Sequence, residues 1–325
     1  MATSTKKRKR QSPSNCPKTS SSYEAKNKLF EHLEIVLFQF PLPLLWIVVS
    51  YVDRHLFDIG TVNRQDRGSF DEGCEIAVDD RFIYVSDIGN HFIHIFTIKG
   101  TRHQKFGGMG EEIFQFHYPR GIAVNNSKLF VADTLNHRIQ IFQKPTKEDN
   151  YLFDVEEELR KNKSTNIVAD RPIYLRLCNE KIILLNYGMQ VMIFNISTCV
   201  CEKQWSVSRL RPPQGLACGD GKIYLVDQNK FYTYSMDGVC LSQSKRRHSS
   251  YPSGLDYDYA NGVIYITDEE DVDCFTVQNG IFTERLIKME QDDWVQEDGE
   301  YGLTYHKDRL YVGLKSRACV SVFFV

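Results

Sequence analysis

Arginine, lysine and tyrosine side chains recur in this sequence in the polar segments that separate short apolar runs. The members of this set are Tyr118, Arg120, Arg171, Tyr187, Arg209, Arg211, Lys245, Arg246, Arg247 and Tyr251. Guanidinium and ammonium groups bind carboxylates and phosphates. Tyrosine rings pack against apolar groups and stack on nucleic-acid bases. We therefore predict that these residues form a partner-binding face.

These residues fall at matching places in a repeated unit, which is clearest between Tyr118 and Phe142. Residues 121–124, 128–132 and 138–142 read as three short strands joined by polar turns. The first strand of each unit carries an apolar reference residue, at Ile76, Ile122, Leu175, Leu216, Leu255 and Leu303. The gaps between them are 46, 53, 41, 39 and 48 residues. Such a period, with several strands per unit, is typical of a β-propeller.

One unit also carries a family signature. The signature reads Pro119-x-Gly121-Ile122-Ala123-Val124, then Leu129-Phe130-Val131-Ala132-Asp133, then Asn136-His137-Arg138-Ile139-Gln140-Ile141-Phe142. It resembles the NHL repeat. The resemblance implies an all-β, six-bladed β-propeller over residues 55–325. It also implies two kinds of partner, because some NHL-repeat relatives are ubiquitin ligases and others bind single-stranded RNA.

The repeat pattern does not bring catalytic side chains together at its innermost positions. The residues just before the six reference positions, which a ring of repeats would bring to its centre, are Glu75, Gly121, Tyr174, Gly215, Gly254 and Gly302. They supply one carboxylate and no histidine, and no nucleophile is spaced beside a base. We predict a protein that is not an enzyme and has no cofactor or metal. A metal-dependent six-bladed propeller enzyme is the less favoured reading. Asp133 and Arg138 are interpreted as a structural pair.

Charge and cysteine usage favour a nuclear or cytoplasmic protein. The 40 basic and 42 acidic residues give a net charge of −2. Residues 1–28 hold eight Lys or Arg and one acid, a charge of +7, which leaves −9 for the rest. An acidic body with a basic tail is not typical of a generic nucleic-acid binder. The nine cysteines are odd in number and include no C-x-x-C pair, which indicates a reducing compartment.

The segment before the repeats divides in two. Residues 1–28 are predicted to be a disordered basic tail. A short cluster in it, Lys6, Lys7, Arg8, Lys9 and Arg10, is typical of a nuclear-import signal. A solvated charge run is the alternative interpretation.

Residues 29–54 are predicted to be helical, and residues 40–53 resemble the opening of an F-box. The residues that carry this resemblance are Pro41, Leu44, Leu45, Val48 and Tyr51. Residues 35–52 lack any charge, so a membrane anchor is a second reading. A helix packed by its apolar side against the propeller is a third.

Residues 55–62 read as a lone strand. The sixth unit has no fourth strand of its own, and an open sheet edge exposes unpaired backbone groups. We therefore predict that this N-terminal strand completes the last sheet and closes the ring. The function predicted for the whole is a protein-interaction platform, with substrate recognition in a ubiquitin-ligase pathway as its specific form. Single-stranded RNA binding is the alternative.

Overall fold

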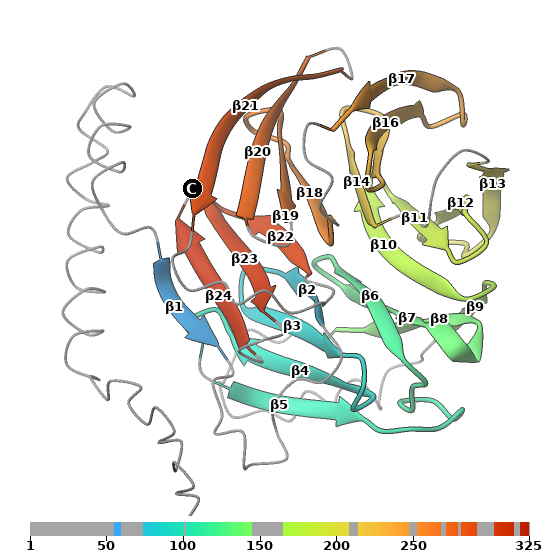
Figure 1. The fold of residues 1–325 in the computed structure, drawn as a ribbon. Coiled ribbons are helices and arrows are strands. Elements are labelled where there is room, and N and C mark those ends of the chain that lie inside the picture. Colours follow the sequence, from blue (N-terminus) through green and yellow to red (C-terminus); the bar gives the residue numbers. More distant parts are fainter. Residues whose placement is uncertain are drawn as a thin grey trace, which may run out of the picture. The chain divides into compact units, whose positions relative to one another are not determined.

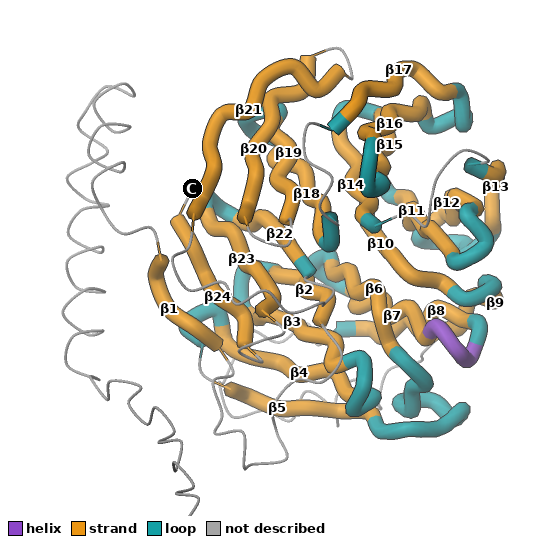
Figure 2. Tube along the Cα trace, in the orientation of Figure 1, coloured by secondary structure: helices purple, strands orange, loops and turns teal. Residues whose placement is uncertain are grey.

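The computed structural model describes residues 55–59, 74–100, 102–144, 165–207, 214–246, 252–267, 271–278, 281–290, 302–314 and 319–324. The chain divides into two units between Asp53 and Arg54, and every described residue belongs to the second. Described secondary structure consists of strands and one 3-10 turn, η1 (Thr134–Asn136), without an α-helix (Figure 2). The tail and helix predicted within residues 1–54 lie outside these ranges. No helix within them is long and apolar enough to cross a membrane.

The described strands form six antiparallel sheets of four strands each. Sheet 1 contains β2 (Cys74–Val78), β3 (Phe82–Asp87), β4 (Phe92–Thr97) and β5 (Arg102–Gly107). Sheet 2 contains β6 (Pro119–Val124), β7 (Lys128–Asp133), β8 (Arg138–Gln143) and β9 (Thr165–Val168). Sheet 3 contains β10 (Pro172–Cys178), β11 (Lys181–Asn186), β12 (Gln190–Asn195) and β13 (Cys201–Ser206). Sheet 4 contains β14 (Gly215–Gly219), β15 (Lys222–Val226), β16 (Lys230–Ser235) and β17 (Cys240–Lys245).

Two sheets remain. Sheet 5 contains β18 (Gly254–Asp258), β19 (Val263–Thr267), β20 (Asp271–Gln278) and β21 (Ile281–Glu290). Sheet 6 contains β22 (Leu303–His306), β23 (Arg309–Leu314), β24 (Cys319–Phe324) and β1 (His55–Ile59). The sheets are arranged around a common centre, with the first strand of each nearest to it (Figure 1). All six reference residues predicted from the repeat lie on these innermost strands.

The burial of each strand follows its distance from the centre. Second strands such as β7 and β11 are buried along nearly their whole length because neighbouring sheets cover both of their faces, so their sequences are continuous apolar runs. The outer strands β13 and β17 are mostly exposed, and their sequences are polar. The apolar runs that marked the repeat are therefore the parts packed between sheets.

The core consists of separate clusters between adjacent sheets. Ile83 and Phe96 of sheet 1 share a buried cluster with Tyr311 and Val322 of sheet 6, which joins the first and last units of the sequence. Other clusters lie between sheets 1 and 2, 2 and 3, 3 and 4, and 4 and 5. The innermost strands approach closely: a Cβ on Gly121 of β6 would lie 2.5 Å from the carbonyl oxygen of Ile173 in sheet 3. This position favours glycine for lack of space.

The N-terminal strand joins the last sheet. Strand β1 pairs antiparallel with β24, with His55 opposite Phe323 and Ile59 opposite Val320. The pairing satisfies backbone groups at the outer edge of β24, as expected for an edge that would otherwise be open. Residues 60–62 of the predicted strand lie outside the described ranges.

Candidate functional site

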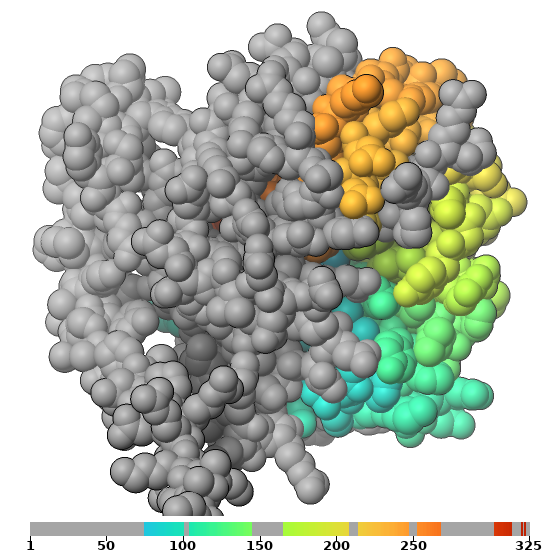
Figure 3. Space-filling view, viewed as in Figure 1, coloured from blue at the N-terminus to red at the C-terminus, as the bar shows by residue number. Residues whose placement is uncertain are grey.

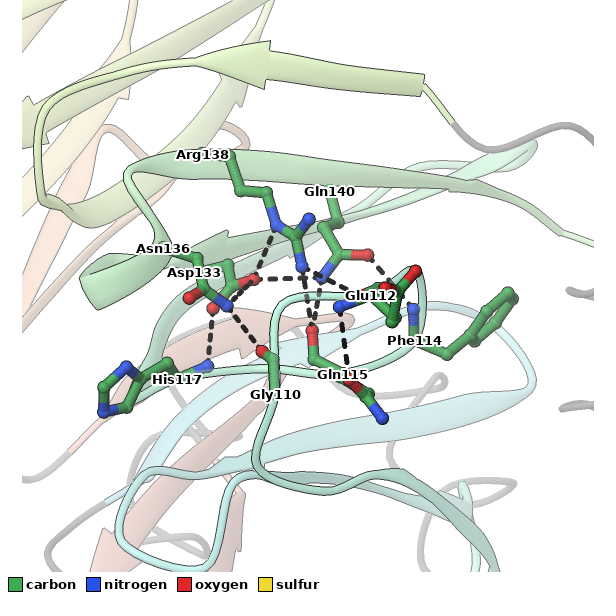
Figure 4. A network of polar contacts seen from close by, with 9 residues as sticks. All are labelled: Gly110, Glu112, Phe114, Gln115, His117, Asp133, Asn136, Arg138 and Gln140. Atoms are coloured by element: carbon green, nitrogen blue, oxygen red, sulfur yellow. Dashed lines mark hydrogen bonds and ion pairs between the residues drawn. The ribbon is translucent and has the colours of Figure 1, made fainter.

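A buried carboxylate fixes the loop that precedes β6. Asp133, at the end of β7, is fully buried, and its oxygens accept hydrogen bonds from Arg138 Nε at 2.8 Å, Asn136 Nδ2 at 2.9 Å and Gln140 Nε2 at 3.0 Å. The backbone N–H of His117 donates a fourth bond of 2.7 Å. Arg138 Nη2 and Gln140 Nε2 also donate to the carbonyl of Gln115 (Figure 4). This geometry agrees with a structural pair, because the carboxylate is already saturated.

Other units use the same position for the same purpose. Asp87, at the end of β3, accepts hydrogen bonds from Asn90 Nδ2 and lies 3.0 Å from His94 Nε2. Asp227 accepts the backbone N–H groups of Asn229 and Lys230 and the hydroxyl of Tyr232. A polar residue at the end of the second strand therefore holds the turn that follows it, as in an Asx turn.

Two neighbouring units also share an uncommon backbone conformation just before the innermost strand. Tyr118 and Arg171 each precede a proline and have φ angles of 56° and 34°. These left-handed values are strained for side chains larger than glycine. Each residue's carbonyl accepts a backbone N–H from the turn after the second strand, Thr134 onto Tyr118 at 3.4 Å and Tyr187 onto Arg171 at 3.1 Å. In both sheets, the loop that enters the innermost strand is thus joined directly to the turn after the second strand.

Three predicted binding residues meet on this face. The Cζ atoms of Arg120 and Arg171 both lie 5.6 Å from the ring centroid of Tyr187, within cation–π distance. Arg120 is on β6 of sheet 2, and the other two belong to loops of sheet 3. Tyr187 is 44% exposed. We call these three residues the Arg–Tyr–Arg cluster. Figure 3 shows the atoms of sheets 2 and 3 side by side at the surface.

Three side chains on the neighbouring loops, His91, His117 and Tyr118, pack against one another. The Tyr118 ring makes an edge contact with His91, with ring centroids 5.1 Å apart, and a tilted contact with His117 at 5.8 Å. The Tyr118 backbone N–H donates to His91 Nδ1 at 3.1 Å. Exposed His137 lies 2.9 Å from Asp170 Oδ1, and Arg171 Nε lies 3.6 Å from the same oxygen. Tyr118 therefore contacts the turn of sheet 1, whereas Arg120, Arg171 and Tyr187 meet across sheets 2 and 3.

The remaining predicted residues divide into two groups. Arg246 Nη1 donates to the carbonyls of Asp227 and Gln228, and its guanidinium lies 5.9 Å from the Phe231 ring, so it stabilises a turn of its own sheet. Lys245 is exposed at the end of β17. The following predicted residues lie outside the described ranges: Arg209, Arg211, Arg247, Tyr251, Lys6, Lys7, Arg8, Lys9, Arg10, Pro41, Leu44, Leu45, Val48 and Tyr51.

An arginine that the sequence prediction missed lies among the innermost strands. Arg176 of β10 is 8% exposed and donates from Nη2 to the carbonyl of Leu255 in sheet 5 at 2.9 Å and to that of Leu303 in sheet 6 at 3.4 Å. Its nitrogens lie 3.6 Å from Glu75 of sheet 1 and 3.7 Å from Asp256 of sheet 5. Burial disfavours the charged guanidinium, but the two carboxylates outweigh it and raise the pKa of Arg176.

One signal in the sequence could have found this arginine. The residues just after the reference positions are Ala77, Ala123, Arg176, Ala217, Asp256 and Thr304. Four of these six residues are small, and the other two, Arg176 and Asp256, carry opposite charges. If the repeats surround a common centre, opposite charges at equivalent innermost positions can come into contact. The Glu75 carboxylate, the one inner acid noted from the sequence, is thus next to a cation. Within the described ranges, no group of three or more His, Cys, Asp or Glu residues could hold a metal ion.

Comparison with known proteins supports the fold more than the function. The NHL repeat family matches residues 116–142, so one NHL repeat is present. The F-box resemblance of residues 40–53 gains no support. No curated protein matches the chain.

Solved structures with a similar fold include two lyases. A streptogramin B lyase structure aligns with a TM-score of 0.53 at 14% sequence identity. The alignment covers 76% of this chain and 77% of the lyase chain. The structure of virginiamycin B lyase from Staphylococcus aureus aligns with a TM-score of 0.53 at 11% sequence identity. This alignment covers 75% of the present chain and 77% of the lyase chain. At these identities the likeness shows a propeller-like fold and nothing about activity.

Proposed function

We propose that this protein is a non-enzymatic protein-interaction platform whose partner surface is the loop face of sheets 2 and 3. One observation carries the proposal: Arg120 of sheet 2 and Arg171 of sheet 3 both lie against the exposed aromatic ring of Tyr187. Exposed tyrosine and arginine side chains are the residue types enriched at the centres of protein interfaces. The surface belongs to a rigid scaffold rather than to a long loop.

The proposal includes a closed, six-bladed ring. It is supported by the six four-stranded sheets, the buried cluster between sheets 1 and 6, and the pairing of β1 with β24. A ring in which first and last sheets are packed together keeps loops from different units at fixed distances. A binding face spread over two units then costs little conformational entropy on association.

The non-enzymatic character rests on the centre of the ring. Its described acids, Glu75 and Asp256, lie beside Arg176, so they are neutralised rather than presented to a substrate or metal. The carboxylate of the NHL signature, Asp133, is saturated by four donors. Neither set is arranged as a nucleophile with its base.

Substrate recognition in a ubiquitin-ligase pathway is a narrower form of this proposal. It rests on the resemblance of residues 40–53 to an F-box. Co-purification with a cullin adaptor that is lost on removing residues 29–54 is the expected result, and unchanged co-purification would exclude this role.

Import into the nucleus through residues 6–10 is tested by fusing residues 1–28 to a fluorescent protein, which should then concentrate in nuclei.

Single-stranded RNA binding is the second candidate. Tyr118 and Tyr187 offer rings for base stacking, and Arg120 and Arg171 offer cations for phosphates. The two candidates differ in their response to nuclease. Affinity purification of the full chain and of its Tyr187→Ala variant, each with and without nuclease, should give partners that survive nuclease and depend on Tyr187. Partners lost on nuclease treatment alone would favour RNA.

A further inference from the structure

The geometry points to an anion-binding clamp at the Arg–Tyr–Arg cluster that takes an acidic segment of a partner peptide. The inference rests on the proposed interaction function and adds the chemistry of the partner. Two guanidinium groups are each 5.6 Å from one tyrosine ring, so the face of that ring compensates part of their mutual repulsion. A carboxylate held by these guanidinium groups would be bound by charge-assisted hydrogen bonds, which are among the strongest in proteins.

The backbone beside both arginines is fixed by the preceding sheet. Ser86 Oγ of sheet 1 donates to the Arg120 carbonyl at 2.8 Å. Thr134 Oγ1 of sheet 2 donates to the carbonyl of Pro172, the residue after Arg171, at 2.7 Å. Because these hydroxyl bonds hold the backbone on the strands that carry or follow both arginines, little further ordering of the backbone is required when an anion binds.

The charges around the clamp suit one or two anionic groups. Asp170 has its close contact with His137 at 2.9 Å and a longer one with Arg171 at 3.6 Å, so an incoming carboxylate competes only with the weaker contact. Two other arginines have different partners: Arg138, the first residue of β8, binds Asp133, and Arg246, which follows β17 of sheet 4, donates to two backbone carbonyls. Arg120 and Arg171 are the two arginines that meet at the Tyr187 ring, so their positive charges lie together at one point of the surface.

This distribution favours a peptide over a single-stranded nucleic acid. Nucleic-acid strands gain affinity from a track of cations along many phosphates. Here the neighbouring loops carry exposed carboxylates at Glu111, Glu112 and Asp170, which would repel any anionic groups beyond the one or two at the clamp and so disfavour a continuous phosphate strand. Leu135, 40% exposed in the turn that contains Thr134, offers an apolar contact beside the clamp. An acidic peptide with an apolar residue matches both features.

The test is selection from a random peptide library displayed on phage, with the full chain as bait. Selected peptides should be enriched in Asp and Glu. Fluorescence anisotropy of the best peptide should show at least about tenfold weaker binding when its acids are changed to amides, and a similar loss for Arg120→Glu and for Arg171→Glu. Lys99→Glu, an equal charge change in the exposed turn after β4, is the control and should bind normally. Melting temperatures verify that each variant is folded.

The other outcomes separate this inference from the proposed function. Peptides that need Tyr187 but are neither acidic nor sensitive to the arginine charges would overturn the clamp and leave the interaction surface in place. If no selected peptide depends on Tyr187, both the clamp and the proposed surface fail. Binding of an oligouridylate that is lost in Arg171→Glu, with no binding of acidic peptides, would overturn the clamp in favour of RNA.

Discussion

Arg176 of sheet 3 and Glu75 of sheet 1 lie 3.6 Å apart from Nη1 to Oε2, although a whole sheet separates them in the sequence order. The same guanidinium reaches Asp256 of sheet 5 and a carbonyl of sheet 6. One side chain thus connects four sheets at their innermost strands. Both members of the pair are nearly buried, so each depends on the other for compensation of its charge.

Replacing Arg176 by Met should destabilise the protein by about 3–5 kcal/mol, because the Glu75 and Asp256 carboxylates lose their buried cation. Urea unfolding monitored by tryptophan fluorescence measures the change. The surface substitution Lys99→Met should stay within about 0.5 kcal/mol of wild type. A loss of less than about 1 kcal/mol for Arg176→Met would show that the network contributes little.

Asp133→Ala should also cost about 3–5 kcal/mol, since the His117 N–H loses its side-chain acceptor, the buried amide of Gln140 loses one of its two acceptors, and Arg138 loses its carboxylate. Thermal unfolding is a suitable measurement. Asp170→Ala, which removes a carboxylate that is 56% exposed, is the matched control and should cost under about 1 kcal/mol. Equal effects of the two substitutions would contradict the assignment of Asp133 as the structural residue.

The buried thiols of Cys178 and Cys218 should titrate as an unequal pair. A hydrogen bond from Cys218 lowers the pKa of Cys178 to about 7, and the same bond raises the pKa of Cys218 well above its ordinary value. Thiolate absorbance of wild type should therefore rise as the pH passes about 7. In Cys218→Ala the hydrogen bond is lost while burial still opposes the thiolate, so this rise should move to higher pH. Cys240→Ala, at an exposed cysteine, should keep it.

Deleting residues 50–65 should lower the melting temperature sharply, because β24 then loses the strand that pairs with its outer edge. Scanning calorimetry gives the comparison, with deletion of residues 1–28 as the control that should leave the transition unchanged. An unaltered transition after the larger deletion would mean that β1 contributes nothing to the last sheet.

The sheets could be predicted from the sequence because the apolar runs and turns of each repeated unit are local in the chain. The reference residues from Ile76 to Leu303 recur at the apolar start of each unit, and all six occupy innermost strands. Residues 55–62 were read as a strand from their own sequence, and their place in the last sheet was inferred from its missing fourth strand. Strand β1 (His55–Ile59) does pair with β24.

Contacts within the site depended on residues far apart in sequence. Arg176 and the carbonyl it binds in Leu303 are 127 positions apart, and no local pattern connects them. Arg246 was predicted to bind a partner, and this stays a prediction. Its guanidinium also donates to two backbone carbonyls of sheet 4, which the sequence of a loop arginine does not reveal. Arg120, Arg171 and Tyr187 were each predicted as binding residues. Their meeting on one ring followed only from the packing of sheet 2 against sheet 3.

Hydrogen–deuterium exchange of the full chain, alone and with the most abundant nuclease-resistant partner recovered by affinity purification, tests the partner surface most directly. The account predicts slower exchange on binding in residues 117–120, 134–137, 169–172 and 187–189. The turns at the other ends of the strands, such as residues 179–180 and 220–221, should be unchanged. Protection confined to those turns, with no change around Tyr187, would contradict it.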